Sequence, residues 1–402
     1  MKNPIKPALY AGSALLALAL AAAPAAADDH FFGADIKTAE AAVEATSLAE
    51  KWLNGEIPSD VNVTYDGPVI NYRYASYLPA VAGLEKLMDR ALKVLEKDTN
   101  GKIKYQSFHS QSLHPQREAF NAVRDGIADY SACFMIYEPT SFDMLHGLTL
   151  PFLFDDSSAA TRIAMELYPT YFKEEYENMG VYIGREFVTP PYNMIGNSKY
   201  LRLEDWQGSK VRLAGRTQVA ALKRLGGVPV SIPSGEAYTS LQRGLVDTVA
   251  MNDPALMIFK LQEISKFHNQ VALFSVNLEY CVSQDWFDGL PDDLKQVYYH
   301  WNQKTNLMLA QLFYERVGRR AESVFVKAGV EPVKPTAAEI QRWQAAVAPV
   351  TEEWVAETEG KGLPAKAMLA DIEKMKATYG PQPWNEQFQA ILDAPIKGLI
   401  DF

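Results

Sequence analysis

The sequence predicts an α/β protein of two similar lobes, joined by crossover strands and spanned by one long helix. The first observation is that short apolar strands alternate with amphipathic helices between about residues 69 and 251, a pattern typical of parallel sheets covered by helices. The second is an internal echo, because EAFNAVRDGIAD at residues 118–129 returns as EAYTSLQRGLVD at residues 236–247. Each copy has the form of a helix, a glycine stop and a strand. Two related units are the favoured interpretation, and chance similarity is the alternative.

Residues 1–27 have the pattern of a signal peptide, in which Lys2 and Lys6 precede an alanine-rich apolar core. We therefore expect an exported chain, and no later stretch is apolar for long enough to cross a bilayer. The full chain carries 39 basic and 49 acidic residues, a net charge of −10, which becomes −12 without the two lysines of the leader. This charge argues against nucleic acid or an anionic membrane surface as partner. Any anion-binding site must then be local.

Residues 28–65 form the predicted N-terminal helical extension, with one amphipathic helix at 39–53. Lobe I is assigned to residues 66–188, and residues 277–290 return to it. Within this lobe, strands are expected at 69–75, 103–108, 129–134, 181–187 and 279–284, and helices at 84–95, 116–124 and 159–167. Ser76 and Tyr77 follow the first of these strands, at the edge where open sheets bind ligands.

Lobe II is assigned to residues 189–276 and begins at Pro190-Pro191, which indicates a hinge or a crossover. In this lobe, strands are expected at 194–196, 210–213, 228–232 and 246–251, and helices at 218–225 and after Ser234. The last of these strands ends at Asn252-Asp253.

Arg212 is the candidate binding residue of lobe II. Apolar and basic residues alternate in the strand at 210–213, so Arg212 points away from the face that Val211 and Leu213 bury. Its guanidinium offers a planar fork of donors that matches a carboxylate. An ion pair with an internal acid is the alternative.

Beyond the lobes, residues 291–328 are predicted to form the long spanning helix, and residues 329–402 a C-terminal helical cover. The two cysteines, Cys133 and Cys281, can form at most one disulfide, and two separate buried thiols are the favoured interpretation.

Known catalytic and cofactor motifs are absent. The sequence has no nucleophile elbow, phosphate loop, dinucleotide fingerprint or zinc motif. His109 and His114 lie five residues apart without an obvious third ligand, so no metal site is predicted there. An enzyme is not expected, nor is a cofactor.

The chain resembles the periplasmic solute-binding subunits of TRAP transporters, the tripartite ATP-independent family, and in particular their dicarboxylate-binding type. The segments that carry this resemblance are GKIK at 101–104, QSL at 111–113, DGIAD at 125–129, LPF at 150–152, GSKVR at 208–212, LGGVP at 225–229 and the second copy of the echo. The resemblance implies a two-lobed periplasmic binding protein fold. It further implies that the protein closes over a small organic acid in the periplasm and passes the acid to a membrane permease.

The resemblance also implies that Arg212 holds the ligand carboxylate. A second arginine of the family is replaced here by Tyr192, whereas Asn197 fits a polar position five residues later. Arg216 is a candidate to restore the lost charge, with a solvent-facing helix start as the alternative. The full set of candidate ligand-binding residues is Arg212, Asn252, Asp253, Asn197, Tyr77, Ser76, Tyr192 and Arg216. Asp253 and Glu279 could serve as oxygen ligands of a metal ion, but no metal is predicted.

Two other functions compete with transport. A ligand-presenting sensor would bind a similar acid and dock on a receptor, and an exported enzyme would turn the acid over.

Overall fold

The computed structural model describes residues 30–31, 34–35 and 47–402. The predicted leader at 1–27 and the first part of the helix predicted at 39–53 lie outside these residues. What is described of that helix is α2 (Leu48–Leu53), and the short strands β1 (His30–Phe31) and β2 (Ala34–Asp35) pair with each other. No helix in these ranges is both long enough and apolar enough to span a membrane.

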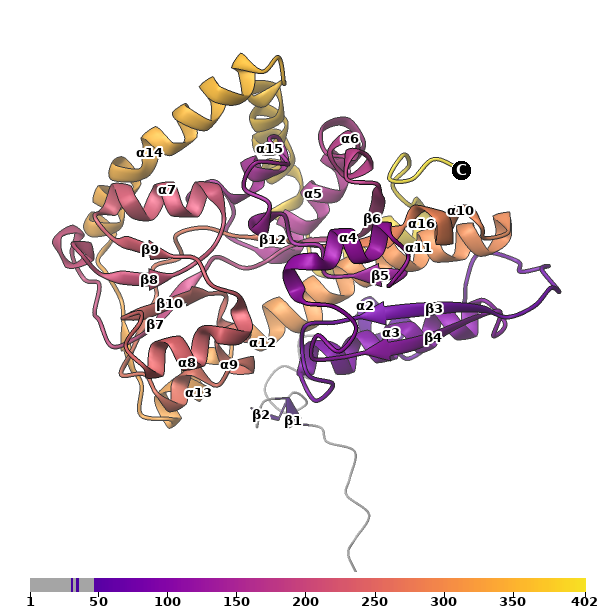
Figure 1. The fold of residues 1–402 in the computed structure, drawn as a ribbon, viewed down its shortest axis with the longest axis horizontal. Coiled ribbons are helices and arrows are strands. Elements are labelled where there is room, and N and C mark those ends of the chain that lie inside the picture. The colour runs from indigo at the N-terminus through magenta and orange to yellow at the C-terminus, as the bar shows by residue number, and fades with distance from the viewer. Residues whose placement is uncertain (1–29, 32–33, 36–46) are drawn as a thin grey trace, which may run out of the picture.

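Lobe I is built on a five-stranded sheet (Figure 1). Its strands, in sheet order, are β4 (Ile103–Phe108), β3 (Ile70–Ala75), β5 (Tyr130–Ser131), β12 (Asn277–Ser283) and β6 (Val181–Val188). Its helices are α3 (Gly83–Asp98), α4 (Ala119–Arg124), α5 (Ser157–Tyr171), α6 (Lys173–Asn178) and α10 (Gln284–Asp288). The chain returns to this sheet late in the sequence, where β12 pairs with both β5 and β6.

Lobe II is built on a six-stranded sheet. Its strands, in sheet order, are β13 (Glu331–Val333), β11 (Phe267–Asn269), β7 (Asn193–Gly196), β10 (Thr248–Met251), β8 (Lys210–Arg212) and β9 (Val228–Val230). Its helices are α7 (Arg216–Leu225), α8 (Ala237–Gln242) and α9 (Asp253–Ile258). Strands β8, β9 and β10 run parallel, so their carboxyl ends meet at one edge.

Two extended segments connect the lobes side by side. One leads from β6 to β7 through residues 189–192, and the other leads back from β11 to β12 through residues 270–276. Backbone hydrogen bonds join them, from Thr189 N–H to the Val276 carbonyl (2.9 Å) and from Tyr192 N–H to the Phe274 carbonyl (2.8 Å). The predicted crossover strands are thus present, as a hydrogen-bonded pair on which two lobes can rotate.

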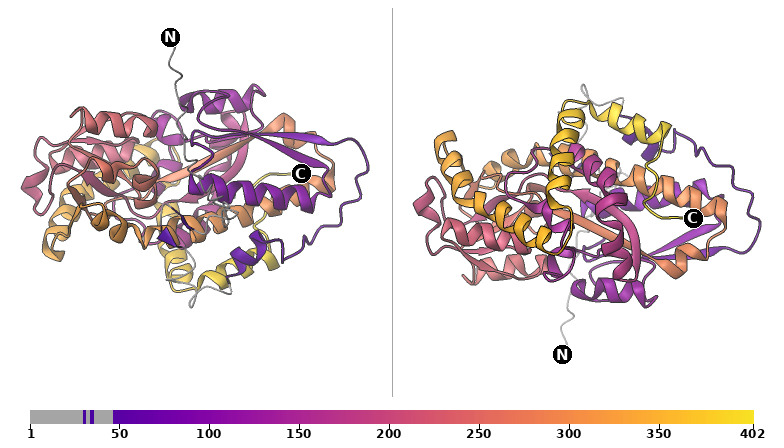
Figure 2. Two further views of the ribbon diagram at one scale, coloured as in Figure 1. Left: turned by 90° about the horizontal axis from the view of Figure 1, so that it is seen from below. Right: turned by 90° about the horizontal axis from the view of Figure 1, so that it is seen from above.

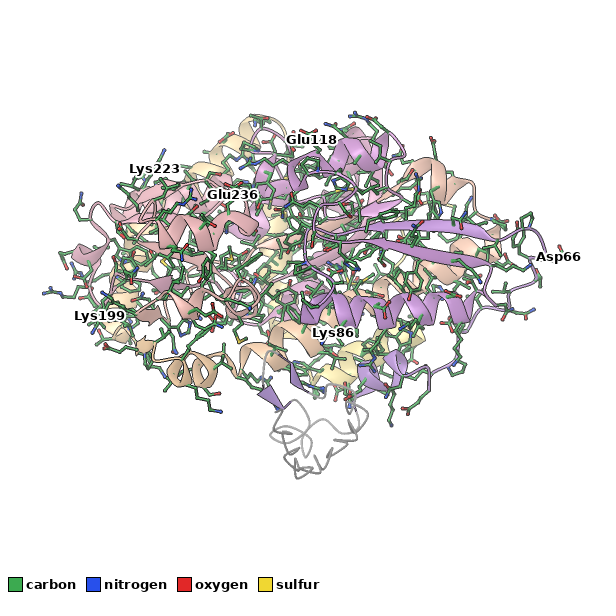
Figure 3. The ribbon with its side chains drawn as sticks, turned by 60° about the horizontal axis from the view of Figure 1, so that its bottom comes forward. Asp66, Lys86, Glu118, Lys199, Lys223 and Glu236 are labelled. Atoms are coloured by element: carbon green, nitrogen blue, oxygen red, sulfur yellow. A yellow bond between two sulfur atoms is a disulfide. The ribbon has the colours of Figure 1, made fainter. Side chains whose placement is uncertain are left out.

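The internal echo corresponds to a structural repeat. Gly126 and Gly244 close α4 and α8 with the same φ of 69°, a left-handed conformation that favours glycine. The next residues fold back alike, since Ile127 N–H bonds to the Ala122 carbonyl and Leu245 N–H to the Ser240 carbonyl. Glu118 and Glu236 open the two copies on different lobes (Figure 3).

The long helix does cross both lobes, but it is interrupted. It consists of α11 (Asp292–Met308), the π-helix η7 (Leu309–Glu315), α12 (Arg316–Gly318) and α13 (Ala321–Lys327). α11 packs on α3 and β6 of lobe I, whereas α13 packs on α9 and β13 of lobe II. The wider π-turn lies where the helix passes between the lobes, and π-turns are frequent at functional sites.

Three helices end the described chain: α14 (Ala337–Gly360), α15 (Ala365–Tyr379) and α16 (Trp384–Asp393). α14 covers α7 of lobe II, and α15 packs on α5 of lobe I (Figure 1). α16 lies beside α2 (Figure 2), where the Trp52 and Phe388 rings are 6.2 Å apart. Helix α2 therefore packs on α16.

The expectation of two separate thiols is wrong. Cys133 and Cys281 form a disulfide, with their Cα atoms 5.6 Å apart. Cys133 follows β5 and Cys281 lies in β12, so the pairing of these two strands brings both cysteines to one place. Because 147 residues separate them in the chain, local sequence could not reveal this proximity.

Candidate ligand-binding site

A cavity lies between the two lobes. Lobe I, the returning crossover and η7 contribute Tyr77, Leu84, Phe134, Ile136, Val276, Leu278, Phe313 and Tyr314 to its lining. Lobe II and its crossover contribute Tyr192, Arg212, Ala214, Ser234, Met251, Asn252, Ala255, Ile258 and Phe259. Since both lobes supply the walls, a ligand held here contacts both at once.

Arg212 is the charged group of this lining. It ends β8, between Val249 of β10 and Val230 of β9, and its side chain is only 3% exposed. Its Nε donates to the Ile232 carbonyl (3.0 Å) and one Nη lies 3.4 Å from the Ser234 hydroxyl. Among the residues that the structure describes, no carboxylate pairs with this guanidinium. Donors therefore remain for an anionic ligand, and the alternative of an internal ion pair is not observed.

Ser234 links Arg212 to lobe I. It opens the 3₁₀ turn before α8, and its hydroxyl lies 3.4 Å from the Tyr137 hydroxyl of the opposite lobe. The sequence predicted a helix after Ser234, and the structure turns the hydroxyl of Ser234 toward Arg212. Sequence reasoning therefore missed Ser234 as a site residue.

Tyr192 and Asn252 stand beside Arg212. Burial raises the pKa of the Tyr192 hydroxyl, while the Arg212 cation and a hydrogen bond with Asn252 oppose this rise. Asn252 Oδ1 accepts from Ala255 N–H (3.0 Å) and so caps α9. Its side-chain amide is thereby fixed at the edge of the cavity.

The remainder of the lining is apolar and rich in aromatic rings. The aromatic members are Tyr77, Phe134, Tyr192, Phe259, Phe313 and Tyr314. The Tyr77 and Phe134 rings pack edge to face, with centroids 5.3 Å apart. Binding sites of this composition take a mostly apolar ligand body and fix it through a few polar groups. Phe313 and Tyr314 come from the π-helix, whose position no sequence pattern indicated.

Three predicted residues lie elsewhere. Ser76 is buried and donates to Glu85 Oε1 (2.7 Å), beside a separate small cavity of lobe I. Asp253 accepts two bonds from Asn193 Nδ2 (3.0 and 3.1 Å) and pairs with His268 Nε2 (2.9 Å). Asn197 follows β7, which runs antiparallel to β10, so it stands at the edge opposite the carboxyl ends and is exposed. The structure does not bring these side chains to the cavity.

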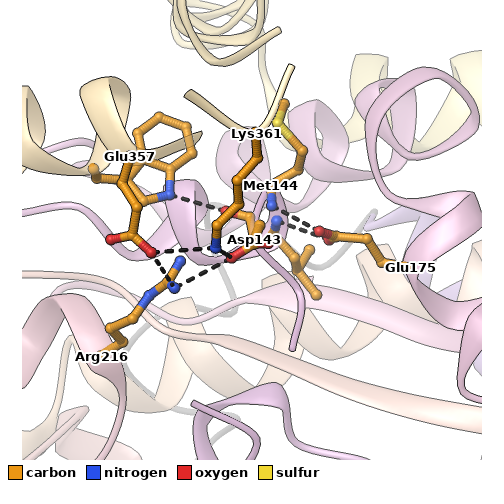
Figure 4. Close-up of polar contacts among 8 residues, drawn as sticks. Asp143, Met144, Glu175, Arg216, Glu357 and Lys361 are labelled. Atoms are coloured by element: carbon orange, nitrogen blue, oxygen red, sulfur yellow. Dashed lines mark hydrogen bonds and ion pairs between the residues drawn. The ribbon is translucent and has the colours of Figure 1, made fainter. Parts of the chain in front are cut away.

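Arg216 does not line the cavity either and lies in a cluster of ion pairs (Figure 4). Its Nη1 lies 3.2 Å from both Asp143 Oδ1 and Glu357 Oε1, and Lys361 completes this cluster at 2.8 Å from Asp143. Hence Arg216 joins α7 of lobe II to the loop at Asp143 and to the end of α14. Its charge does not replace the one lost at Tyr192.

Glu279 lies behind the cavity wall and is fully buried. Its carboxyl accepts from Met135 N–H (3.0 Å) and from Asn277 Nδ2 (2.8 Å), and burial raises its pKa to about 8. Asp253, the other candidate metal ligand, pairs with His268 instead. Within the described ranges there is no group of three or more His, Cys, Asp or Glu side chains that could hold a metal ion.

Comparison with known proteins gives one family. The sequence model described as bacterial extracellular solute-binding protein, family 7, matches residues 79–358. An uncharacterized protein of Salmonella typhimurium, YiiZ, is 29% identical over 185 residues, which are 43% of this chain and 54% of that relative. The alignment thus spans about half the length of that curated relative.

Two solved structures show a similar fold. A TRAP solute-binding protein from Rhodoferax ferrireducens, in complex with copurified benzoate, has a TM-score of 0.72 and 18% identity. The match covers 78% of this chain and 99% of that one. A TRAP periplasmic solute-binding protein from Bordetella bronchiseptica, with bound mandelate, has a TM-score of 0.71 and 22% identity, over 77% of this chain and 99% of that one.

Proposed function

Because this chain belongs to family 7 of the bacterial extracellular solute-binding proteins, the solute-binding proteins of TRAP transporters, we propose that it captures a small organic acid for uptake. The acid is held by its carboxylate and delivered to a membrane permease. Members of this family are extracytoplasmic, and the leader pattern at residues 1–27 supports the periplasm as the compartment. The family consists of transport components, which favours this function over an exported enzyme.

The proposal rests on the surroundings of Arg212, whose guanidinium is buried and faces the cavity. A buried guanidinium without an acidic partner is costly unless a ligand supplies the negative charge. Its free donors face a cavity whose walls come from both lobes. A carboxylate bound there makes charge-assisted hydrogen bonds, each contributing about 1.5–3 kcal/mol.

The lining supports an acid with an aromatic or apolar body. Aromatic rings surround the cavity, and the polar side chains near Arg212 are Ser234, Asn252 and the Tyr192 hydroxyl. The similar structures that contain benzoate and mandelate bind acids of this kind. A polyhydroxylated sugar acid would leave several hydroxyls without partners against these rings, which is unfavourable.

Isothermal titration calorimetry with benzoate and mandelate tests the function. We expect the wild-type protein to bind one of these acids at 1:1 stoichiometry without turnover. Arg212→Ala should weaken binding at least 100-fold, because the whole fork of donors is lost, and Arg212→Lys should bind poorly, because an ammonium is only a point charge.

Arg224→Ala is the matched control. Arg224 lies on α7 of the same lobe, 44% exposed and paired with Glu353, so its loss should leave affinity unchanged. Equal affinities of the Arg212→Ala and wild-type proteins would refute the role of Arg212.

A further inference from the structure

A second buried arginine lies close behind the cavity. Arg185 in β6 is fully buried, with its guanidinium 3.6 Å from the Tyr280 ring centroid and 4.7 Å from that of Phe187. Its Nη1 lies 3.5 Å from the sulfur of Met88, whereas Nε and Nη2 have no hydrogen-bond partner in the described part of the chain. No carboxylate of the described residues pairs with it. Like Arg212, it is a buried cation without an internal counter-ion.

One layer of side chains separates Arg185 from the cavity. Tyr314 lines the cavity and packs on Phe187, with ring centroids 4.8 Å apart, and Phe187 in turn lies against the guanidinium. On α3, Leu84 lines the cavity, and Met88, which contacts Arg185, is four residues further along the same helix face. Arg185 therefore stands behind the lobe I wall, while Arg212 stands in the lobe II wall.

The environment of Arg185 leaves its charge incompletely compensated. The faces of Tyr280 and Phe187 stabilise a cation, which offsets part of the desolvation. Rings cannot accept the in-plane N–H groups of Nε and Nη2, and unsatisfied donors of a buried charge are strongly unfavourable. A purely structural arginine in a strand would be expected to have an acidic or carbonyl partner for these donors.

We propose that Arg185 is a second ligand-binding residue, which takes a second anionic group of the acid held by Arg212. This inference rests on the proposed function. The ligand class is then an organic acid with acidic groups at both ends of an aromatic or apolar body. Tyr314, carried by the π-helix, is the side chain that must turn to admit the second group.

A two-ended ligand also explains why the two arginines lie in different lobes. One carboxylate engages Arg212 of lobe II and the other engages Arg185 of lobe I. Both contacts form together only in the closed arrangement, so the ligand binds that form better and shifts the equilibrium toward it.

Calorimetry with a matched pair of acids tests this inference. Benzene-1,4-dicarboxylate and benzoate share one ring and differ by one carboxylate. We expect the wild-type protein to bind the diacid at least 10-fold more tightly than benzoate. Arg185→Met should remove this preference by weakening the diacid at least 10-fold, and should leave benzoate within about threefold of its wild-type affinity.

Thermal melting separates ligand binding from a structural role. Arg185→Met replaces an uncompensated buried cation by an unbranched apolar side chain, so the melting temperature without ligand should stay the same or rise. Arg162→Met is the matched control: Arg162 is a buried arginine of lobe I that pairs with Glu166, so its loss should lower the melting temperature and leave the ratio of the two affinities unchanged. Arg185→Lys, which keeps the charge and loses the fork, provides a second variant if the methionine protein does not fold, and it too should weaken the diacid selectively.

The possible outcomes distinguish the proposed function, capture of an acid by Arg212, from the second binding role of Arg185. If benzoate binds as tightly as the diacid, and Arg185→Met changes neither, the second site is refuted while capture of a carboxylate by Arg212 stands. If Arg185→Met melts lower and weakens both acids equally, the residue is structural and the inference fails. If neither acid nor mandelate binds the wild-type protein, the proposed function fails first.

Discussion

Two buried carboxyl groups, Glu186 and Glu279, occupy paired positions on strands β6 and β12 of lobe I. Asn277 Nδ2 donates to both, at 3.2 Å and 2.8 Å. Burial and the proximity of Glu279 raise the pKa of Glu186, and burial raises that of Glu279 from 4.5 to about 8. At neutral pH the folded protein therefore holds a proton that the unfolded chain has released.

This proton makes stability depend on pH. Between about pH 4.5 and pH 8 the folded state binds more protons at Glu279 than the unfolded state, so stability falls as the pH rises through this window. The loss is on the order of a few kcal/mol. Glu279→Gln cannot ionise, so its melting temperature should fall less between pH 5 and pH 9 than that of the wild-type protein. The exposed Glu118→Gln should follow the wild type, and equal slopes for the Glu279→Gln and wild-type proteins would contradict a raised pKa.

Single residues show where sequence patterns carry information about the site. Arg212 could be predicted to leave the buried face of its strand, because strand alternation has a period of two. For Arg216 and Asp253 the sequence gives only the position along the chain. The directions of their side chains are set by ion pairs with Asp143, 73 residues from Arg216, and with His268, 15 residues from Asp253. Arg185 was missed because its strand is buried on both faces and shows no alternation.

Among the elements, the disulfide fixes one wall of the cavity. Cys133 is followed by Phe134, which lines the cavity, and Cys281 lies in β12 between lobe I strands. The bridge spans a sequence separation of 148, and closing a long loop in the unfolded chain stabilises a protein by about 2–5 kcal/mol. The double variant Cys133→Ser/Cys281→Ser should therefore unfold at lower denaturant concentration and bind its acid more weakly.

Urea denaturation followed by fluorescence measures the effect of the disulfide. Wild-type protein treated with a reductant serves as the control and should approach the double variant. A midpoint that neither the substitutions nor the reductant change would show that the bridge contributes nothing to stability.

Elements were easier to predict than their interruptions. The strand at 69–75 and the helix at 84–95 correspond closely to β3 and α3, because their periodicity is strong. The strand predicted at 129–134 shrinks to Tyr130–Ser131, since the chain after it turns into the cavity wall. The long stretch after Pro291 keeps helical spacing throughout, so its pattern could not reveal the π-turn at Leu309–Glu315.

At the scale of the whole molecule, the two-lobed fold followed from the echo, whose copies occupy equivalent places in the two sheets. Asp129 N–H bonds to the Arg73 carbonyl of β3, and Asp247 N–H bonds to the Lys210 carbonyl of β8. The cavity arises only where the lobes meet. Its lining combines residues from Tyr77 to Tyr314, and that combination depends on the relative position of the lobes, which no local pattern encodes.

The position of the lobes depends in turn on contacts outside the cavity. Partial burial acts to raise the pKa of Asp143, but Lys361 and Arg216 hold it below its usual value, so this carboxylate is ionised at neutral pH and joins the lobes. These groups are partly exposed, so the cluster stabilises the closed arrangement by only about 1 kcal/mol.

Asp143→Asn should therefore weaken acid binding by a factor of about five, with little change in the melting temperature. Small-angle X-ray scattering without ligand should show a larger radius of gyration for the variant, and high salt should move the wild-type protein in the same direction, because salt screens exposed ion pairs. An unchanged radius together with unchanged affinity would mean that the crossover pair and the long helix alone set the angle between the lobes.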